Sequence, residues 1–231
     1  TALIYSPALN GPFLFDDLPF IIHNPWLEGK IDFDSILKSS RGQLTRFIGF
    51  LTLAVNYRLS GLETFGYHFF NLLVHGVVSF LIWQLFRVIL AKERDGEVIA
   101  FAAVALFAVH PLQTQAVSYI SQRFTVLATL FYIVAAIFYL KARLKSDVSE
   151  KRMCFIGMIF FGVLGLFTKE TILTLPLSII LLEIFVIRDK RPRIGAGIAT
   201  FAAFAGIFLL TFSWRKFVSM LGEPLPSESF P

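Results

Sequence analysis

FFNLLVHGVVSFLIWQLFRVIL, residues 69–90, is long and apolar enough to cross the hydrocarbon core of a bilayer as one helix. Such a crossing requires about 20 consecutive, predominantly apolar residues. Five further apolar segments follow it, at residues 98–109, 124–140, 153–167, 171–187 and 194–212. We therefore predict an all-α, polytopic membrane helix bundle, in which residues 69–213 contain six membrane helices.

The composition of the whole chain supports this fold class. Of its 231 residues 56% are hydrophobic and only 16% are charged, and the mean hydropathy is +0.71, whereas about a quarter of a soluble domain is charged. The single cysteine, Cys154, excludes an intrachain disulfide. The net charge is +5, but the basic residues cluster between apolar segments, so nucleic acid is not an expected partner.

The basic clusters predict the orientation of the helices, because cytoplasmic loops carry an excess of Lys and Arg. Of the 21 Lys and Arg, 12 lie in the connections after the first, third and fifth segments: Arg87, Lys92, Arg94, Lys141, Arg143, Lys145, Lys151, Arg152, Arg188, Lys190, Arg191 and Arg193. We place these connections in the cytoplasm. Residues 1–68, the other connections and residues 214–231 are then expected on the opposite, outer side.

The two ends of the chain suggest a fragment. Residues 1–13 resemble the outer end of a membrane helix whose beginning is missing, and they lack the charged start and long apolar run of a signal peptide. Residues 214–231 are expected to be an incomplete extracytoplasmic tail. Residues 1–68 are thus predicted as the end of a first membrane helix followed by a long outer loop.

The outer loop is predicted to contain two helices, at residues 32–40 and 43–60. The second has an apolar stripe that includes Phe47 and Leu51. The opposite stripe consists of Thr45, Gly49, Thr52 and Asn56. Such a helix lies in the membrane surface, with Phe47 and Leu51 toward lipid, or packs on the other helices as an ordinary surface helix.

Two adjacent carboxylates, Asp16 and Asp17, lie within the apolar sequence FDDLPFIIHNP. In a soluble loop, such a pair is solvated or caps a helix. Ionisable residues at membrane depth, however, are generally functional. Two neighbouring carboxylates also differ in their affinity for a proton, so one of them is favoured as a base. We predict Asp17 and Asp16 as catalytic residues, with the order of the two left open.

Polar residues are also predicted at the outer ends of the helices. His68, Asn71 and His75 share one helix face, where they line a cavity or bond to neighbouring helices. A metal site is not expected there, because no Cys or third His stands at ligand spacing. His110, followed by Pro111, breaks the second helix at a depth where non-helical backbone is tolerated only inside protein or along a cavity.

Two further positions carry charge at the same predicted side. Arg123 begins the third apolar segment, where it extends toward headgroups or contacts a phosphate, which suits a planar guanidinium. Lys169 and Glu170 form a surface pair of little energetic value, or they place a cation and a carboxylate in a cavity. One outer cavity is predicted to receive Asp16, Asp17, His110, Arg123 and Lys169.

The order of these motifs resembles a known group of proteins. FLFDD and an Asn-Pro pair are followed by an Arg-led helix that ends in Asn-Tyr, by GYHFFNLLVH, by HPLQTQAVSYISQR, and by Lys-Glu before a further span. This pattern covers nearly the whole chain. It resembles bacterial relatives of the transmembrane and tetratricopeptide-repeat (TMTC) proteins and, more distantly, protein O-mannosyltransferases and other GT-C glycosyltransferases.

The resemblance implies a GT-C-like fold and an enzyme that uses a polyprenyl-phosphate sugar on the side away from the cytoplasm. The acidic motif of the family corresponds to Asp16 and Asp17. Its Arg-Pro motif corresponds to Arg46 and Phe47, so the proline is lost here.

The chain departs from the family pattern in one segment. Many relatives carry Glu where this chain has Gln115, and an Asp shortly after the arginine, where this chain has Phe124 and Thr125. A second acid from this segment is therefore not expected. The repeats that suggest protein acceptors have no counterpart here, which leaves a protein or a glycan as the acceptor.

These expectations combine into one mechanism. Arg123 and Lys169, with Arg46 as a lesser candidate, would stabilise the departing phosphate. Asp17 or Asp16 would deprotonate a hydroxyl acceptor, whose in-line attack inverts the anomeric carbon. The remaining predicted cavity residues are His68, Asn71, His75, His110, Gln115 and Glu170. No cofactor beyond the lipid-linked donor is expected, and a role for a divalent metal is left open.

We expect an integral protein of a bacterial inner membrane, with its active site toward the periplasm or exterior. Its expected partners are membrane lipid and, as a further option, the subunits of a larger membrane assembly. Two alternatives belong to other functional classes. A transporter would need polar residues along a path to the cytoplasm, yet the inner halves of the segments are almost wholly apolar. A noncatalytic membrane subunit of the same fold is the second alternative.

Overall fold

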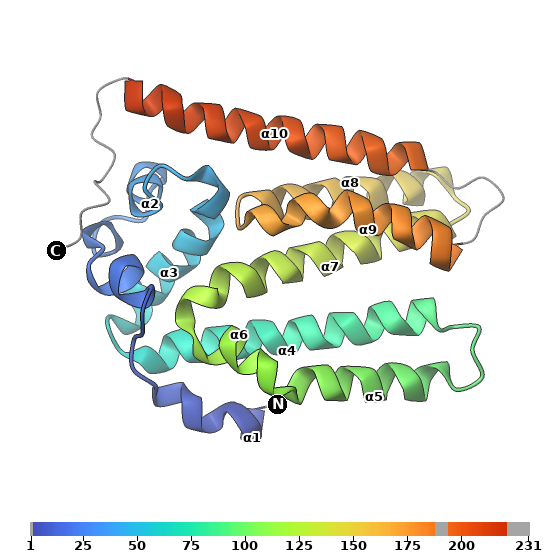
Figure 1. Ribbon diagram of the computed structural model, residues 1–231, viewed down its shortest axis with the longest axis horizontal. Helices are drawn as coiled ribbons and strands as arrows, with labels where there is room; N and C mark the ends of the chain where they lie inside the picture. Colours follow the sequence, from blue (N-terminus) through green and yellow to red (C-terminus); the bar gives the residue numbers. More distant parts are fainter. Residues whose placement is uncertain (1, 188–193, 221–231) are drawn as a thin grey trace.

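The computed structural model describes residues 2–187 and 194–220, and within these ranges the chain is helical and contains no strand (Figure 1). The predicted all-α bundle is confirmed. Its long helices run along one common direction: α4 (Thr64–Ile89), α5 (Gly96–Val109), α7 (Arg123–Leu144), α8 (Val148–Leu166), α9 (Leu175–Leu181) with η8 (Leu182–Ile187), and α10 (Ile194–Met220).

Three helical stretches are long and apolar enough to cross a membrane: Thr64–Ile89, Ile120–Leu144 and Glu170–Ile187. The pair Gly96–Val109 and Pro111–Ser118, bent by 51°, makes a fourth if it is one broken span. With these segments the chain is an integral membrane protein. α8 begins with several charged residues, and the apolar part of α10, Thr200–Thr211, is shorter. The six membrane helices within residues 69–213 stay a prediction.

The C-terminal boundary differs from the predicted one. α10 continues to Met220, whereas we expected the last membrane helix to end by residue 213. The sequence between these points contains neither glycine nor proline, so nothing in it stops a helix before Gly222. Residues 221–231 of the predicted tail and the basic connection at 188–193 lie outside the described residues.

The break after α5 is confirmed. His110 has an extended conformation, with φ −62° and ψ 135°, because the residue before a proline is disfavoured in the α region. Three short helices then lead to α7: η5 (Pro111–Gln113), α6 (Thr114–Ser118) and η6 (Ile120–Gln122). This break turns the chain back toward the end of the bundle at which α7 begins (Figure 1).

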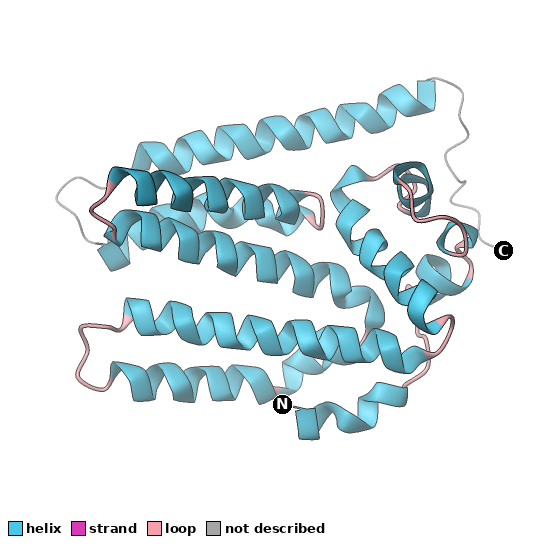
Figure 2. Ribbon diagram, turned by 180° about the vertical axis from the view of Figure 1, so that it is seen from behind, coloured by secondary structure: helices cyan, strands magenta, loops and turns pink. Residues whose placement is uncertain are grey.

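The N-terminal region covers one end of the bundle (Figures 1 and 2). Its elements are α1 (Ala2–Tyr5), η1 (Ser6–Asn10), η2 (Leu18–Ile22), η3 (Pro25–Leu27), α2 (Phe33–Ser39), η4 (Leu44–Arg46) and α3 (Phe47–Ser60). α7 and η7 (Glu170–Thr174) begin at this same end, and the α4–α5 and α7–α8 connections lie at the other. The basic α4–α5 and α7–α8 connections therefore lie at one end of the bundle, and the N-terminal region lies at the other.

The two predicted outer helices form, and α2 begins as expected. Asp32 is its N-cap and accepts a 2.8 Å hydrogen bond from the Ser35 backbone N–H. The predicted helix at residues 43–60 appears as η4 followed by α3, which crosses the end of the bundle at a steep angle to α4 and α7 (Figure 1).

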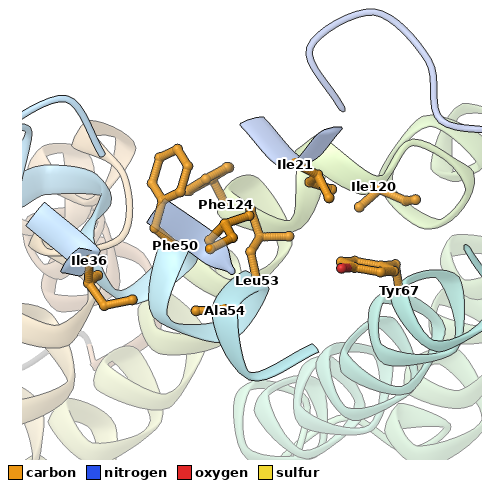
Figure 3. Close-up of a cluster of buried hydrophobic side chains, with 9 residues drawn as sticks. Ile21, Ile36, Phe50, Leu53, Ala54, Tyr67, Ile120 and Phe124 are labelled. Atoms are coloured by element: carbon orange, nitrogen blue, oxygen red, sulfur yellow. The ribbon is translucent and has the colours of Figure 1, made fainter. Parts of the chain in front are cut away.

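The buried face of α3 is not the one that the sequence predicted. Phe50, Leu53 and Ala54 are buried in a cluster with Ile21, Leu27, Ile36, Tyr67, Ile120 and Phe124 (Figure 3). Phe47 and Leu51 are half-buried and line an apolar groove of the protein instead of facing lipid alone. Apolar residues occupy most positions of this helix and lie on all of its sides, so their spacing does not select one face.

Gly49 permits the closest approach in this cluster. A Cβ atom at this position would lie 2.1 Å from Cδ1 of Phe124, far inside van der Waals contact. α3 therefore packs directly on the first turn of α7, and any side chain at residue 49 would force the two helices apart.

We expect Gly49→Ala to destabilise the protein by about 1–3 kcal/mol through overpacking. The control is Gly76→Ala in α4, where an added Cβ meets no atom within 4 Å and the gain in helix propensity is up to about 1 kcal/mol. Thermal unfolding in a fixed detergent measures both variants. Equal midpoints for the two would show that α3 does not press on Phe124.

Candidate functional site

Arg123, the first residue of α7, is buried in the bundle with 1% of its surface exposed. Its guanidinium donates four hydrogen bonds of 2.8–3.2 Å, to Asn71 Oδ1, Thr52 O, Asn56 Oδ1 and Tyr67 O. A phosphate could reach this group only by displacing these acceptors. The predicted phosphate contact of Arg123 is therefore wrong in this conformation, and the residue instead positions α3, α4 and α7.

The polar stripe of α4 is likewise used inside the protein. His68, Asn71 and His75 are each 1% exposed. Their side chains bond to backbone carbonyl groups of other segments: His68 to Gly11, Asn71 to Tyr119 and Ile120, and His75 to Ala108. Asn71 and His75 thus bond to other helical segments, whereas His68 bonds to the N-terminal loop and its buried Nδ1 has no partner among the described residues. At 1% exposure, none of the three faces an open cavity.

Asp17 is buried and ties the outer loop to the segment before α7. Its Oδ1 accepts hydrogen bonds from the backbone N–H and the hydroxyl of Ser121, and its Oδ2 accepts one of 3.0 Å from the Leu14 N–H. The carboxylate is 1% exposed. Since both oxygens are engaged and shielded, Asp17 is suited to hold the loop in place and poorly suited to take a proton from a substrate.

Asp16, in contrast to the buried Asp17, is exposed. Its backbone N–H donates a 3.0 Å hydrogen bond to the Tyr119 hydroxyl. Phe15, the residue before it, has a left-handed φ of 46°, which is unusual for a bulky side chain. Burial raises the pKa of Tyr119, so this phenol remains protonated. The bend at Phe15 thus leaves the Asp16 carboxylate available to a substrate.

A polar cavity of about 290 Å³ lies between the start of α3, the start of η7 and α10. Its lining residues are Gly42, Gln43, Leu44, Thr45, Arg46, Glu170, Phe208 and Thr211. Thr45 donates a 3.1 Å hydrogen bond from its hydroxyl to Glu170 Oε1. The cavity joins Arg46 to Glu170 of the predicted Lys169–Glu170 pair, two residues that are far apart in the sequence.

Arg46 lines this cavity and has one side-chain donor without a partner among the described residues. Its guanidinium carbon lies 5.9 Å from the ring centre of Phe20 and 5.7 Å from that of Phe124. Its Nε is buried and has no hydrogen-bond partner in the part of the chain that the structure describes. A cationic donor held by two rings and left without an acceptor is a candidate for binding an anion.

Lys169 adds a second cation beside Arg46. Its Nζ donates a 2.7 Å hydrogen bond to the Thr125 hydroxyl, which donates a 2.7 Å bond to Gln122 Oε1. Burial lowers the pKa of Lys169, the charge of Arg46 lowers it further, and Glu170 opposes both. Two cations near one carboxylate leave a net positive charge, which an anionic group would neutralise.

An apolar groove of about 540 Å³ adjoins this polar cavity. It is lined by Phe33, Leu44, Phe47, Ile48, Leu51, Phe131, Leu164 and Phe167. Leu44 belongs to both linings. The two hollows together therefore offer a cationic end and an apolar end to a single amphipathic ligand.

The remaining predicted site residues lie elsewhere. His110 and Gln115 are exposed and are not among the residues that line the Arg46 cavity. His110 caps η5, where its Nδ1 accepts a 3.2 Å hydrogen bond from the Leu112 N–H. None of the five residues predicted to share an outer cavity lines the Arg46 cavity, and Asp17 and Arg123 are each 1% exposed. A common cavity for the other three stays a prediction.

Several residues in or near the cavity were not predicted as site residues from the sequence. Gln43 and Leu44 line it, Phe20 lies beside Arg46, and Thr125 accepts a hydrogen bond from Lys169. Thr45 had a signal, since it was part of the polar stripe that begins the second outer helix. The other four have ordinary local sequences, so only the tertiary structure identifies them.

Comparison with known proteins gives several relatives. The chain is 32% identical over 76% of its length to a protein O-mannosyl-transferase of Caenorhabditis elegans, and it covers 26% of that protein. It is 26% identical over 85% of its length to protein O-mannosyl-transferase TMTC1 of Mus musculus, and 29% identical over 73% to protein O-mannosyl-transferase TMTC4 of that species, covering 22% and 26% of these proteins. No family model and no solved structure matches the chain.

The predicted resemblance is thus confirmed as similarity to TMTC-type protein O-mannosyl-transferases. The chain spans about a quarter of the length of these curated relatives. The bacterial source and the GT-C classification stay predictions.

We expect Arg123→Met to destabilise the protein by about 3 kcal/mol or more, because each buried acceptor left unpaired costs about 1–3 kcal/mol. The control is Arg58→Met: Arg58 is exposed at the end of α3 and donates to the Gly29 carbonyl. We expect that change to cost under about 1 kcal/mol. Thermal unfolding compares the two. A similar small shift for both would contradict a structural role for Arg123.

Proposed function

We propose that this chain is the membrane part of a glycosyltransferase that moves a mannosyl group from a polyprenyl phosphate to a hydroxyl group of a protein. One observation carries the proposal: Arg46, whose buried Nε has no hydrogen-bond partner among the described residues, lines a polar cavity that shares Leu44 with an apolar groove. The names of the relatives supply the sugar and the acceptor class.

The donor is an amphipathic molecule, and the two hollows match its two ends. Arg46 and Lys169 bind the phosphate, whose negative charge grows as the bond to the sugar breaks. The first isoprene units occupy the apolar groove, where Phe47 and Leu51 contribute surface from α3. Arg46, a lesser candidate from the sequence, thereby replaces Arg123 as the leading phosphate ligand.

Asp16 is the proposed general base. The acceptor oxygen attacks the anomeric carbon, the bond between that carbon and the phosphate oxygen breaks, and its electron pair stays on the phosphate. The acceptor proton passes to Asp16, and the configuration inverts. Glu170 is less suited to this role, because it lines the cavity of Arg46 and its charge would oppose that of the departing phosphate.

The reaction takes place on the side away from the cytoplasm. The Arg46 cavity lies at the end of the bundle opposite the α4–α5 and α7–α8 connections, which carry Arg87, Lys92, Arg94, Lys141, Arg143 and Lys145 at or near their ends (Figure 1). Positive loops face the cytoplasm. In a bacterial inner membrane, the site would then face the periplasm.

We expect Arg46→Gln to weaken binding of polyprenyl phosphate by about ten- to a hundredfold, since a charge-assisted hydrogen bond contributes about 1.5–3 kcal/mol. Binding is measured with the full-length protein in nanodiscs, and Arg58→Gln is the matched control on the exposed end of α3. If Arg46→Gln binds the lipid as tightly as the control does, the cavity is not the donor site.

We expect Asp16→Asn to lower sugar transfer by about 10²-fold or more, with unchanged donor binding and thermal stability, because it removes only the base. Asp17→Asn should lower the unfolding midpoint as well, since its carboxylate accepts three hydrogen bonds. Asp34→Asn, on the exposed face of α2, is the control. Full transfer by the Asp16 variant would show that Asp16 is not the base.

A further inference from the structure

A second cavity, of about 260 Å³, lies deeper along the bundle, between α7 and η7. Its lining residues are Ala128, Thr129, Tyr132, Thr171 and Thr174. Neither the predicted site nor the proposed phosphate site includes any of them. Four of the five carry a hydroxyl group, and none carries a charge.

The hydrogen bonds of this cavity leave acceptors available. Thr129 donates its hydroxyl proton to the Thr125 carbonyl at 2.8 Å, and Thr174 donates to the Thr171 carbonyl at 2.9 Å. A hydroxyl oxygen has two lone pairs besides its proton. With their protons directed to backbone carbonyls, Thr129 and Thr174 can accept hydrogen bonds from a ligand.

Threonines in membrane helices often bond to a carbonyl of the preceding turn, without any ligand. That habit accounts for the bond of Thr129. It does not account for hydroxyls from two separate segments that converge on one hollow, where Tyr132 also pairs with Ser178 of α9. Beyond Tyr132, the neighbouring cavity is apolar and is lined by Leu85, Ile133, Ala136, Leu181, Leu182, Phe185 and Val186 together with Tyr132 and Ser178.

We propose that the cavity of Thr129, Tyr132, Thr171 and Thr174 binds a neutral sugar ring. An uncharged, acceptor-rich lining suits a ligand with many hydroxyl donors and offers no cation to an anion. The apolar lining beyond Tyr132 ends the polar region, so it receives one ring and not a longer glycan.

The position relative to Lys169 supports this assignment. Thr125 accepts a hydrogen bond from Lys169 through its hydroxyl and one from Thr129 through its carbonyl. The sugar cavity therefore begins one helical turn from the residue that anchors Lys169. A sugar phosphate would place its anion beside Lys169 and its ring against Thr129, a step that rests on the proposed function.

Two small probes separate the sugar cavity from the phosphate site: octyl mannoside, which has no charge, and octyl phosphate, which has no sugar. Their binding is measured with the full-length protein in phosphatidylcholine nanodiscs. The double variant Thr129→Val and Thr174→Val keeps the side-chain shape but removes both acceptors. It should weaken octyl mannoside about tenfold and leave octyl phosphate unchanged.

Control variants test whether the effect is specific to the sugar probe. Arg46→Gln should weaken octyl phosphate and leave octyl mannoside unchanged. Thr114→Val, on the exposed start of α6, should change neither. Thr129→Ser with Thr174→Ser restores the hydroxyls and should restore mannoside binding, which distinguishes lost acceptors from a damaged fold.

Unchanged mannoside binding by the double valine variant would overturn the sugar cavity. If the valine variant loses mannoside binding but Arg46→Gln leaves octyl phosphate unaffected, the sugar cavity stands and the proposed donor site fails. The source of the ring is then tested with polyprenyl phosphate mannose. If the valine variant no longer binds polyprenyl phosphate mannose more tightly than bare polyprenyl phosphate, the ring in the cavity is the donor sugar. If the difference in affinity is unchanged, the ring is a sugar on the acceptor.

Discussion

The buried guanidinium of Arg123 is the interaction on which the packing of α3, α4 and α7 depends. Its four hydrogen bonds reach Thr52 and Asn56 of α3 and Tyr67 and Asn71 of α4, while the residue itself belongs to α7. A charge enclosed in this way is tolerated only when its donors are satisfied. Three helices that are far apart in sequence are therefore held in one arrangement by one side chain.

The residues next to Arg123 extend this arrangement in different directions. Ser121 binds Asp17 of the outer loop, Phe124 packs on Gly49 and lies beside Arg46, and Thr125 binds Lys169. Ser121 of η6 and Arg123, Phe124 and Thr125 at the start of α7 thus contact four other parts of the chain. The candidate catalytic loop and both candidate phosphate ligands are placed relative to one helix end, which explains how groups from distant sequence positions keep a common geometry.

The sequence predicted the features that depend on neighbouring residues in the chain. It did not predict the contacts that polar side chains make with distant segments. Apolar length located the helices, the Asp32 cap located α2, and Pro111 located the break after α5. It could not show that Arg123, Asn71 and His75 bond to neighbouring segments, since a polar residue at a helix end looks the same in sequence whether it faces a cavity or a neighbour. Nor could it choose between Asp16 and Asp17, because that difference arises from the bend at Phe15.

The break at His110 has a consequence for how the protein is made. Backbone carbonyls freed at a break inside a bilayer need internal partners, and here His75 bonds to the Ala108 carbonyl and Tyr5 to that of His110. Both partners precede α5 in the chain, so they leave the ribosome before the carbonyls that need them. Synthesis in this order lets α5 enter lipid beside helices that already offer its missing hydrogen bonds.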